Sequence, residues 1–334
     1  MTDKTLRLLT SVALLLAFIV VVLGAYTRLS DAGLGCPDWP GCYGAVVVPG
    51  ADSDIAQANK LYPQRPLQQD KAWKEMIHRY AAGTLGLLIL SLAAVAWKRR
   101  SLPGQQVWIP VILLGLVIFQ ALLGMWTVTL LLKPLIVLAH LLGGMTILLL
   151  LFWAWLNQRA SGHTAPGKTG AREMSPWAIT GLVILYLQIS LGGWTSANHA
   201  ALVCGGFPVC QGQWWPPMDF TEGFTLWHGL TADYSGGVLS VAARTAIHMG
   251  HRIGALVTLL VIGAVAIRAM LDPQQVRKRT GVVLLLLLLT QAGLGIANVL
   301  LLLPLPLAVA HNAVAALLLL CMGVLLFYAR SVID

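Results

Sequence analysis

Charged side chains are scarce in this chain: they make up 10% of its residues, with 13 acidic residues against 22 Lys and Arg. A soluble globule of 334 residues with 57% hydrophobic residues would expose far too much apolar surface. The formal net charge of +9 does not imply nucleic-acid binding, because the basic residues flank apolar runs. The composition therefore predicts a polytopic membrane protein in contact with lipid.

Cysteine is also rare, and the spacings that bind zinc or attach haem covalently are missing. The lack of C-x2-C disfavours zinc, and the lack of C-x-x-C-H disfavours covalent haem attachment. Cys36–Cys42 and Cys204–Cys210 share C-x5-C spacing in segments that fall on the oxidising outer face. We expect two disulfides there, which either staple loops or have a redox or substrate-handling role. The fifth cysteine, Cys321, is expected to be a buried thiol.

Apolar runs long enough to cross a bilayer occur eight times. The first run is longer than a signal-peptide core and has no clear small-x-small cleavage site, so we expect a retained helix. Pro304 and Pro306 separate the last two runs, which would otherwise form one long helix. The predicted spans lie near 7–27, 76–97, 107–128, 135–156, 177–197, 247–268, 281–302 and 306–328.

The positions of Lys and Arg predict the orientation. Most of these residues lie at the N-terminus, in alternate connections between spans and at the C-terminus. The long outer loop 28–75 holds five more, so the asymmetry is incomplete. We expect a multi-pass protein of the bacterial inner membrane with both termini in the cytoplasm.

A series of motifs occurs twice, at an offset of 168 to 173 residues. This duplication predicts two similar sites, one in each half of the chain. The paired motifs are GAYTRLSDAGLGCPDWPGC at 24–42 and GGWTSANHAALVCGGFPVC at 192–210, HRYAAGTLG from His78 and HRIGALVTL from His251, QALLG from Gln120 and QAGLG from Gln291, and VLAHLLGG around His140 and AVAHNAVA around His311.

Four histidines lie within apolar spans at matched depths: His78, His140, His251 and His311. Two imidazoles that face each other across a helix bundle supply the axial ligands of a haem iron, so we predict one pair in each half. The alternative is that each hydrogen-bonds a neighbouring helix. His248 lies three residues before His251 and is an alternative ligand or a neighbour of one, although the repeated His-Arg motif favours His251.

Three further charged residues accompany the histidines. Glu75 lies three residues before His78, where the second half has His248, and a carboxylate beside a haem can relay protons or stabilise positive charge. Its alternative is a solvated residue at a helix start. Arg79 and Arg252 are expected either to bind haem propionates or to extend to lipid headgroups.

These motifs together resemble the haem A synthases, membrane enzymes that oxidise haem O to haem A for cytochrome oxidase. The resemblance covers nearly the whole chain and includes TRLSDAGLGCPDWPGC, the E-x-x-H-R of 75–79, QALLG, both Ala-His pairs and both Cys pairs. It implies an all-α fold of eight transmembrane helices, arranged as two four-helix bundles related by a pseudo-twofold axis. We expect the bundles to span 1–165 and 166–334.

The resemblance also implies the cofactors and the reaction. A resident haem b is expected on His251 and His311, and the substrate haem O is expected near His78, His140 and Glu75. A porphyrin methyl group becomes a formyl group through hydroxylated intermediates, giving haem A. The first Cys pair is expected to matter for activity. The implied partners are membrane lipid, haem O synthase and an electron-transfer protein.

Two other functions use the same histidines. A dihaem cytochrome linked to quinol would need all four but gives Glu75 no role, and a haem transporter or chaperone would need weaker, exchangeable ligands. Detection of haem A after expression in a host that makes haem O but no haem A would distinguish a haem A synthase from these two alternatives. The sequence leaves open the source of the formyl oxygen, the electron donor or acceptor, and the oligomeric state, a homo-oligomer included.

Overall fold

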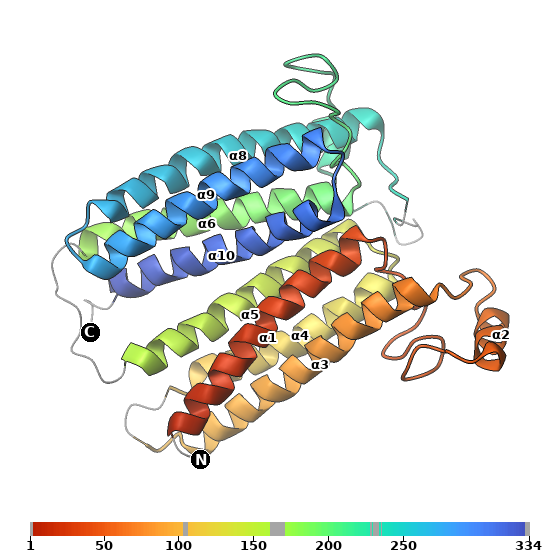
Figure 1. Cartoon of the computed structure of the whole chain (residues 1–334), viewed down its shortest axis with the longest axis horizontal. Coiled ribbons are helices and arrows are strands. Elements are labelled where there is room, and N and C mark those ends of the chain that lie inside the picture. Colours follow the sequence, from red (N-terminus) through yellow and green to blue (C-terminus); the bar gives the residue numbers. More distant parts are fainter. Residues whose placement is uncertain are drawn as a thin grey trace.

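A computed structural model describes residues 3–102, 106–160, 171–227, 229, 234 and 236–330. These described residues form ten helices and no strand (Figure 1), and eight of the helices are long and apolar enough to cross a membrane. The prediction of an all-α protein with eight spans is confirmed. The eight are α1 (Asp3–Leu29), α3 (Gln69–Lys98), α4 (Trp108–Thr129), α5 (Pro134–Ala160), α6 (Ala171–Ala197), α8 (Val241–Met270), α9 (Gln275–Leu300) and α10 (Leu305–Arg330).

Helices α3 and α8 begin about two turns before the apolar runs that predicted them. Backbone hydrogen bonding continues outward past the hydrocarbon limit, because polar residues there still favour a helix. At the start of α8, the hydroxyl of Ser240 accepts a hydrogen bond of 3.1 Å from the backbone N–H of Ala243 and caps the helix. As a consequence, Glu75 and His248 lie inside helices, one turn before the predicted ligands His78 and His251.

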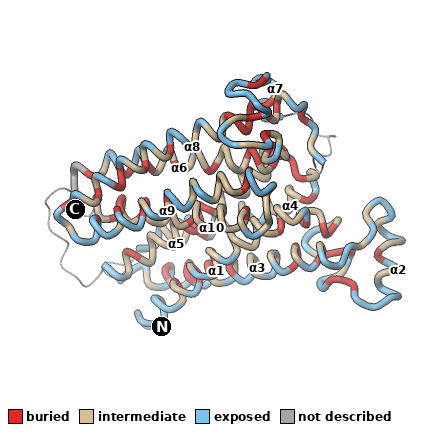
Figure 2. Tube along the Cα trace, turned by 45° about the horizontal axis from the view of Figure 1, so that its top comes forward, coloured by how far each residue is buried: buried red, intermediate tan, exposed pale blue. Residues whose placement is uncertain are grey.

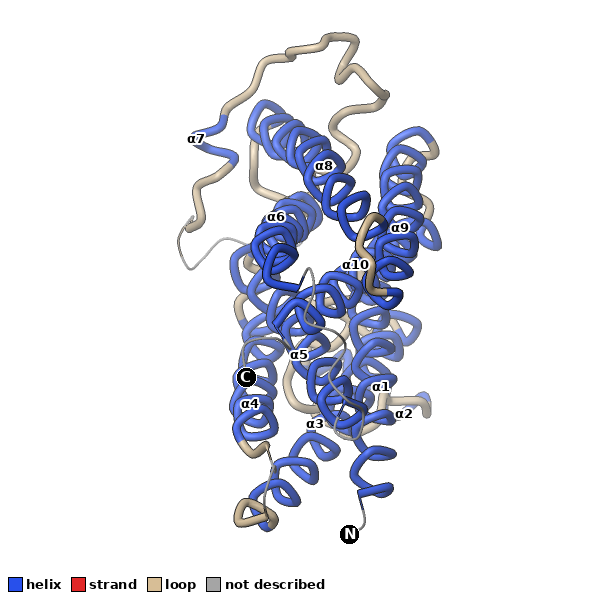
Figure 3. The backbone as a smooth tube through the Cα atoms, turned by 90° about the vertical axis from the view of Figure 1, so that its left-hand side faces the viewer, coloured by secondary structure: helices blue, strands red, loops and turns tan. Residues whose placement is uncertain are grey.

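The eight long helices pack as neighbours in a definite pattern. In the first half, α1 and α4 each contact α3 and α5. In the second half, α6 and α9 each contact α8 and α10. Figure 3 shows α6, α8, α9 and α10 above α1, α3, α4 and α5. Helices α1 and α5 meet α6 and α10 along a line that we call the seam.

The apolar residues divide into a packed interior and a lipid-facing surface. Ile89, Leu148 and Ile262 are fully buried, whereas Leu87 and Leu260 are 66% and 65% exposed (Figure 2). Large exposed apolar side chains are expected where lipid tails cover a helix, since hydrocarbon solvates them as well as a protein core does. Backbone polar groups are satisfied within each helix, which a membrane interior requires.

The loops at the end of the molecule away from the start of α1, which we call the outer end, carry the features that position the site. The start of α1 and the end of α10 lie at one end of the molecule, and the connections α1–α3 and α6–α8 lie at the other (Figure 1). These connections contain two short helices that the sequence did not predict, α2 (Asp52–Leu61) and α7 (Phe220–Gly223). Disulfides close the first cysteine loop, residues 36–42, and the second cysteine loop, residues 204–210, as predicted.

Candidate functional site

The first predicted histidine pair lies face to edge between α3 and α5. The ring centroids of His78 and His140 are 6.5 Å apart, with an angle of 76° between the ring planes. A metal–imidazole bond of about 2.0 Å on each side, with each nitrogen about 1.2 Å from its centroid, places two centroids about 6.4 Å apart. The spacing therefore fits two axial ligands of one haem iron. The Nδ1 atoms of both rings are buried and have no hydrogen-bond partner among the described residues.

The second pair consists of His251 on α8 and His311 on α10. The His251 imidazole lies within electrostatic range of His311, whose buried Nδ1 also lacks a partner in the described part of the chain. The side-chain amide of Gln188 is 3.1 Å from Nδ1 of His251 and donates a 3.1 Å hydrogen bond to its carbonyl oxygen. Val20 occupies the corresponding position in the first half, so this amide contact exists at the second pair alone.

A glycine on a neighbouring helix meets each of the four imidazoles edge-on. A Cβ placed on Gly24 would lie 3.1 Å from Cε1 of His78, and one on Gly192 would lie 3.2 Å from Cε1 of His251. These distances are shorter than ordinary carbon–carbon contacts of about 3.5–4.0 Å. The same contact is repeated by Gly124 with His140 at 3.3 Å and by Gly295 with His311 at 3.2 Å.

These glycines all belong to the duplicated motifs. Gly24 and Gly192 open the GAYT and GGWT segments, and Gly124 and Gly295 close QALLG and QAGLG. The four rings therefore pack against bare backbone, which restricts where each imidazole lies. The sequence carried this signal as four repeated glycines, but only the fold reveals which histidine each one contacts.

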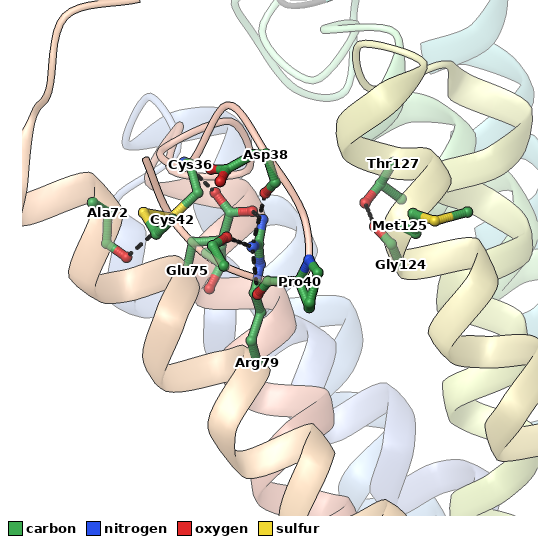
Figure 4. Close-up of polar contacts among 12 residues, drawn as sticks. Cys36, Asp38, Pro40, Cys42, Ala72, Glu75, Arg79, Gly124, Met125 and Thr127 are labelled. Carbon is green, nitrogen blue, oxygen red and sulfur yellow. Dashed lines mark hydrogen bonds and ion pairs between the residues drawn. A yellow bond between two sulfur atoms is a disulfide. The ribbon is translucent and has the colours of Figure 1, made fainter. Parts of the chain in front are cut away.

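Glu75 is the most buried acidic side chain near the first pair. It is 5% exposed, which excludes the interpretation of a solvated residue at a helix start. Its carboxylate accepts a 2.9 Å hydrogen bond from the backbone N–H of Cys36 and forms an ion pair with Arg79 (Figure 4). A buried carboxylate needs such partners to remain charged. Glu75 thus connects the first cysteine loop to the helix that carries His78.

Arg79 completes this connection from the same helix. Its guanidinium donates to the backbone carbonyl oxygens of Asp38, Pro40 and Gly41, in addition to the Glu75 carboxylate (Figure 4). These are four acceptors for one guanidinium, which has five N–H donors. The donors of Arg79 are therefore directed to the first cysteine loop.

The second half repeats this arrangement with one change. Arg252 donates to the carbonyl oxygens of Gly206, Pro208 and Val209 in the second cysteine loop. In place of a carboxylate, Nδ1 of His248 lies 2.9 Å from the carbonyl oxygen of Ala200. His248 is 3% exposed and contacts the segment between α6 and the second cysteine loop, whereas Glu75 contacts its cysteine loop directly. This position supports His251 as the ligand.

Both cysteine loops end in the same tight turn. Cys42 and Ala45 exchange backbone hydrogen bonds of 2.8 and 3.1 Å, and Cys210 and Gln213 exchange two of 2.9 Å. The two residues between each pair have positive φ, and the second of them is a glycine, Gly44 or Gly212. This is the pattern of a type I′ turn, in which glycine is favoured at the second position. The duplication therefore extends to the backbone of the loops.

Two cations, the partly buried Arg28 and the buried Lys133, join the halves at the outer end of the seam, and the sequence did not predict this. Nη2 of Arg28 donates a 2.9 Å hydrogen bond to the carbonyl oxygen of Ser196 and lies 3.3 Å from Nε2 of His199. Burial, together with the charge of Arg28, lowers the pKa of His199 below its ordinary value. Lys133 is 1% exposed and lies 3.4 Å above the ring of Trp227, which is a cation–π contact.

Comparison with known proteins agrees with these features. The COX15-CtaA family, described as cytochrome oxidase assembly protein, matches residues 7–323. A Shewanella oneidensis protein named Heme A synthase is 42% identical over 312 residues, 93% of each chain. A protein of the same name from Shouchella clausii is 31% identical over 66% of this chain and 67% of its own length. Another, from Caulobacter sp., is 29% identical over 92% of this chain and 91% of its own length. The protein belongs to the COX15-CtaA family of cytochrome oxidase assembly proteins.

Proposed function

We propose that this protein is a haem A synthase, an oxidoreductase that converts a methyl group of haem O into the formyl group of haem A. The observation that carries the proposal is the 42% identity to a Heme A synthase along 93% of the chain. The separation of 6.5 Å between the rings of His78 and His140 supports it, because a haem substrate fits between them. A dihaem cytochrome or a haem carrier gives no comparable role to the buried Glu75.

We further propose that residues 1–165 and 166–334 form two four-helix bundles related by a pseudo-twofold axis. The contacts within α1, α3, α4 and α5, and within α6, α8, α9 and α10, support this division. The repeated glycine–histidine contacts and the repeated cysteine loops also support it. Each bundle then holds one haem near its outer end.

The two sites are assigned different roles. His78 and His140 are proposed to ligate the iron of the substrate haem O, and His251 and His311 to hold a resident haem b, which would supply electron transfer. The carboxylate of Glu75 differs from its counterpart His248, so the first site is proposed as the reactive one. In that site Glu75 stabilises positive charge or moves a proton next to the substrate, while Arg79 holds the loop above it.

The proposed setting is the bacterial inner membrane, with both termini in the cytoplasm and both cysteine loops on the oxidising outer face. The two disulfides support this orientation, since disulfides persist outside the cytoplasm. Arg252 is proposed to hold the second cysteine loop over the resident haem, as Arg79 does in the first half. Haem O synthase would supply the substrate, and a separate redox protein would exchange electrons.

Expression in a host that makes haem O but no haem A tests the function. Haems extracted from cells that express the wild-type chain should include haem A. An extract that contains haem O and no haem A would contradict the proposal. His251→Ala should abolish the low-spin spectrum of the resident haem, whereas His248→Ala should retain it. If His248→Ala alone removed that spectrum, the ligand would lie one helical turn from its assigned position. Cys321→Ala is the matched control, because this free thiol lies away from both pairs.

A further inference from the structure

A cavity of about 630 Å³ lies at the outer end of the seam. Its walls come from both halves: α1, the first outer loop and the start of α3 on one side, and the segments at His199 and Gly236 on the other. The titratable residues in the lining also include Arg28, Arg65 and Lys71, with Tyr43, and the acidic Asp31. The cavity therefore carries three cations against one carboxylate.

The positive charge of this cavity is poorly compensated. Asp31 is 4.0 Å from Arg28, and its side chain is 74% exposed, so the pair is weak. Nε of Arg28 is buried and has no acceptor in the part of the chain that the structure describes. Arg65 and Lys71 likewise have no ion-pair partner among the described residues. An anionic ligand would supply the missing acceptors.

The cavity lies just outward of the first histidine pair. Arg28 follows Gly24 by four residues on α1, so the two share a face and are about 6 Å apart along the helix axis. Gly24 is the residue that meets the ring of His78. At the same level, the hydroxyl of Thr27 donates a 3.3 Å hydrogen bond to the carbonyl oxygen of Lys74, which ties α1 to α3. The cavity therefore lies about one helical turn outward of a ligand bound between His78 and His140.

We propose that this cavity binds the propionate carboxylates of the porphyrin that lies between His78 and His140, an inference that rests on the proposed function. Propionates extend from one edge of a porphyrin, and charged carboxylates are excluded from hydrocarbon, so that edge must face the outer end of the bundle. The guanidinium of Arg79 is directed to Glu75 and the first cysteine loop. Arg65, Lys71 and the Nε group of Arg28 are the cationic donors in the cavity that remain for the substrate, and arginine binds carboxylates with two parallel hydrogen bonds.

The cavity also distinguishes the two halves. The residue that corresponds to Arg28 in the second half is Ser196, whose carbonyl oxygen accepts the hydrogen bond from Arg28. The Arg28 position therefore has no cationic counterpart in the second half, whereas Lys71 has one, Arg244 on α8. A substrate that arrives from the membrane and leaves after reaction needs an anchor that fixes which porphyrin edge faces outward, because the methyl group that reacts must meet the same side chains each time.

The test compares two ligands that differ only in charge. Iron protoporphyrin IX and its dimethyl ester are titrated into the full-length protein, with its resident haem, in nanodiscs of neutral phosphatidylcholine. Arg28→Gln and Lys71→Gln should each weaken binding of the free acid by about tenfold and leave the affinity for the dimethyl ester within about twofold of wild type. Lys60→Gln on α2, an exposed charge outside the cavity, is the matched control and should change neither affinity.

Several results would overturn the proposal. Equal losses of affinity for the free acid and the dimethyl ester would show that Arg28 acts through packing across the seam. Lys71→Gln removes no described side-chain contact, so a loss of affinity in this variant cannot be explained by packing. A charge effect that occurs only in nanodiscs with anionic phosphatidylglycerol would assign the cavity to a lipid headgroup instead. Retention of the resident haem spectrum verifies that each variant is folded. Haem A formation is scored separately, so a failure of the proposed function is distinguishable from a failure of the cavity to bind carboxylates.

Discussion

Replacement of Gly295 by alanine tests whether the glycine–histidine contacts position the haem ligands. Gly295 lies on α9, and a Cβ at this position would be 3.2 Å from Cε1 of His311. Ordinary contact between these carbons requires about 3.6 Å, so the imidazole must move by about 0.4 Å or the helices must separate. Metal–ligand distances in proteins tolerate about 0.2 Å. With His311 as the proposed iron ligand, its ring cannot absorb the new methyl group without weakening the bond to the haem.

The size of the effect follows from the cost of overpacking. Inserting one methyl group into a packed site costs about 1–3 kcal/mol, which corresponds to a loss of about 5-fold to 150-fold in haem affinity. The helix itself should gain about 1 kcal/mol, because alanine is a better helix former than glycine. Loss of haem from a protein whose apo form is no less stable would therefore isolate the contact with the ligand.

Gly293→Ala is the matched control for this experiment. Gly293 lies two residues away on α9, and nothing is within 4 Å of a Cβ at this position. Both variants are purified under limiting haem, and the ratio of haem b to protein, the low-spin visible spectrum and the electron paramagnetic resonance signal are measured. Gly295→Ala should lose or alter the low-spin species, and Gly293→Ala should match wild type. Identical spectra and haem contents for the two variants would refute the positioning role.

Four other predictions concern particular contacts. Glu75→Gln should keep normal haem b content but make little haem A, and a wild-type yield would reduce the carboxylate to a structural anchor. Cys36→Ala should lower the haem A yield more than Cys204→Ala, because the first cysteine loop contacts Glu75 directly; equal yields would contradict this. Gln188→Leu removes the amide beside His251, the proposed ligand of the resident haem, and should change the midpoint potential of that haem by at most about 40 mV in a redox titration. The lowered pKa of His199 means that the unfolded chain binds more protons, so thermal stability should fall as the pH drops below about 6.5, and His199→Gln should flatten that dependence.

Local sequence patterns predicted much of this architecture. The spans followed from apolar length, and the break between α9 and α10 followed from Pro304, since α9 ends at Leu300 and α10 begins at Leu305. The C-x5-C spacing predicted both disulfides, because each pair lies in a loop with turn-forming residues. Local pattern is sufficient for such features, as they depend on nearby residues or on the thickness of the membrane.

Contacts between segments that are distant in the chain could not be predicted from the sequence. Nothing in the residues around Arg79 reveals that its donors are directed to carbonyl oxygens about forty positions earlier, and charge alone suggested haem propionates or lipid headgroups instead. Burial of Arg28 against Ser196 likewise depends on how the halves meet. Such interactions arise from tertiary packing, which a motif repeated in one chain does not specify.

Some differences between the halves lie beside the histidine pairs, whereas several backbone features of the scaffold are repeated. The glycine contacts, the tight turns and the arginine bonds to the cysteine loops occur twice. Among the positions that depart from this repetition, Glu75 corresponds to His248, Arg28 corresponds to Ser196, and Val20 corresponds to Gln188. In the first half the changes add a carboxylate and a cation, which suit a charged substrate that must be anchored and oxidised. In the second half they add neutral groups that hydrogen-bond a loop and a ligand, which suit a permanently bound haem whose potential must be set. A duplicated electron carrier would have no reason to place a buried carboxylate beside one ligand pair and a neutral imidazole beside the other, so the pattern favours one reactive site served by one redox site.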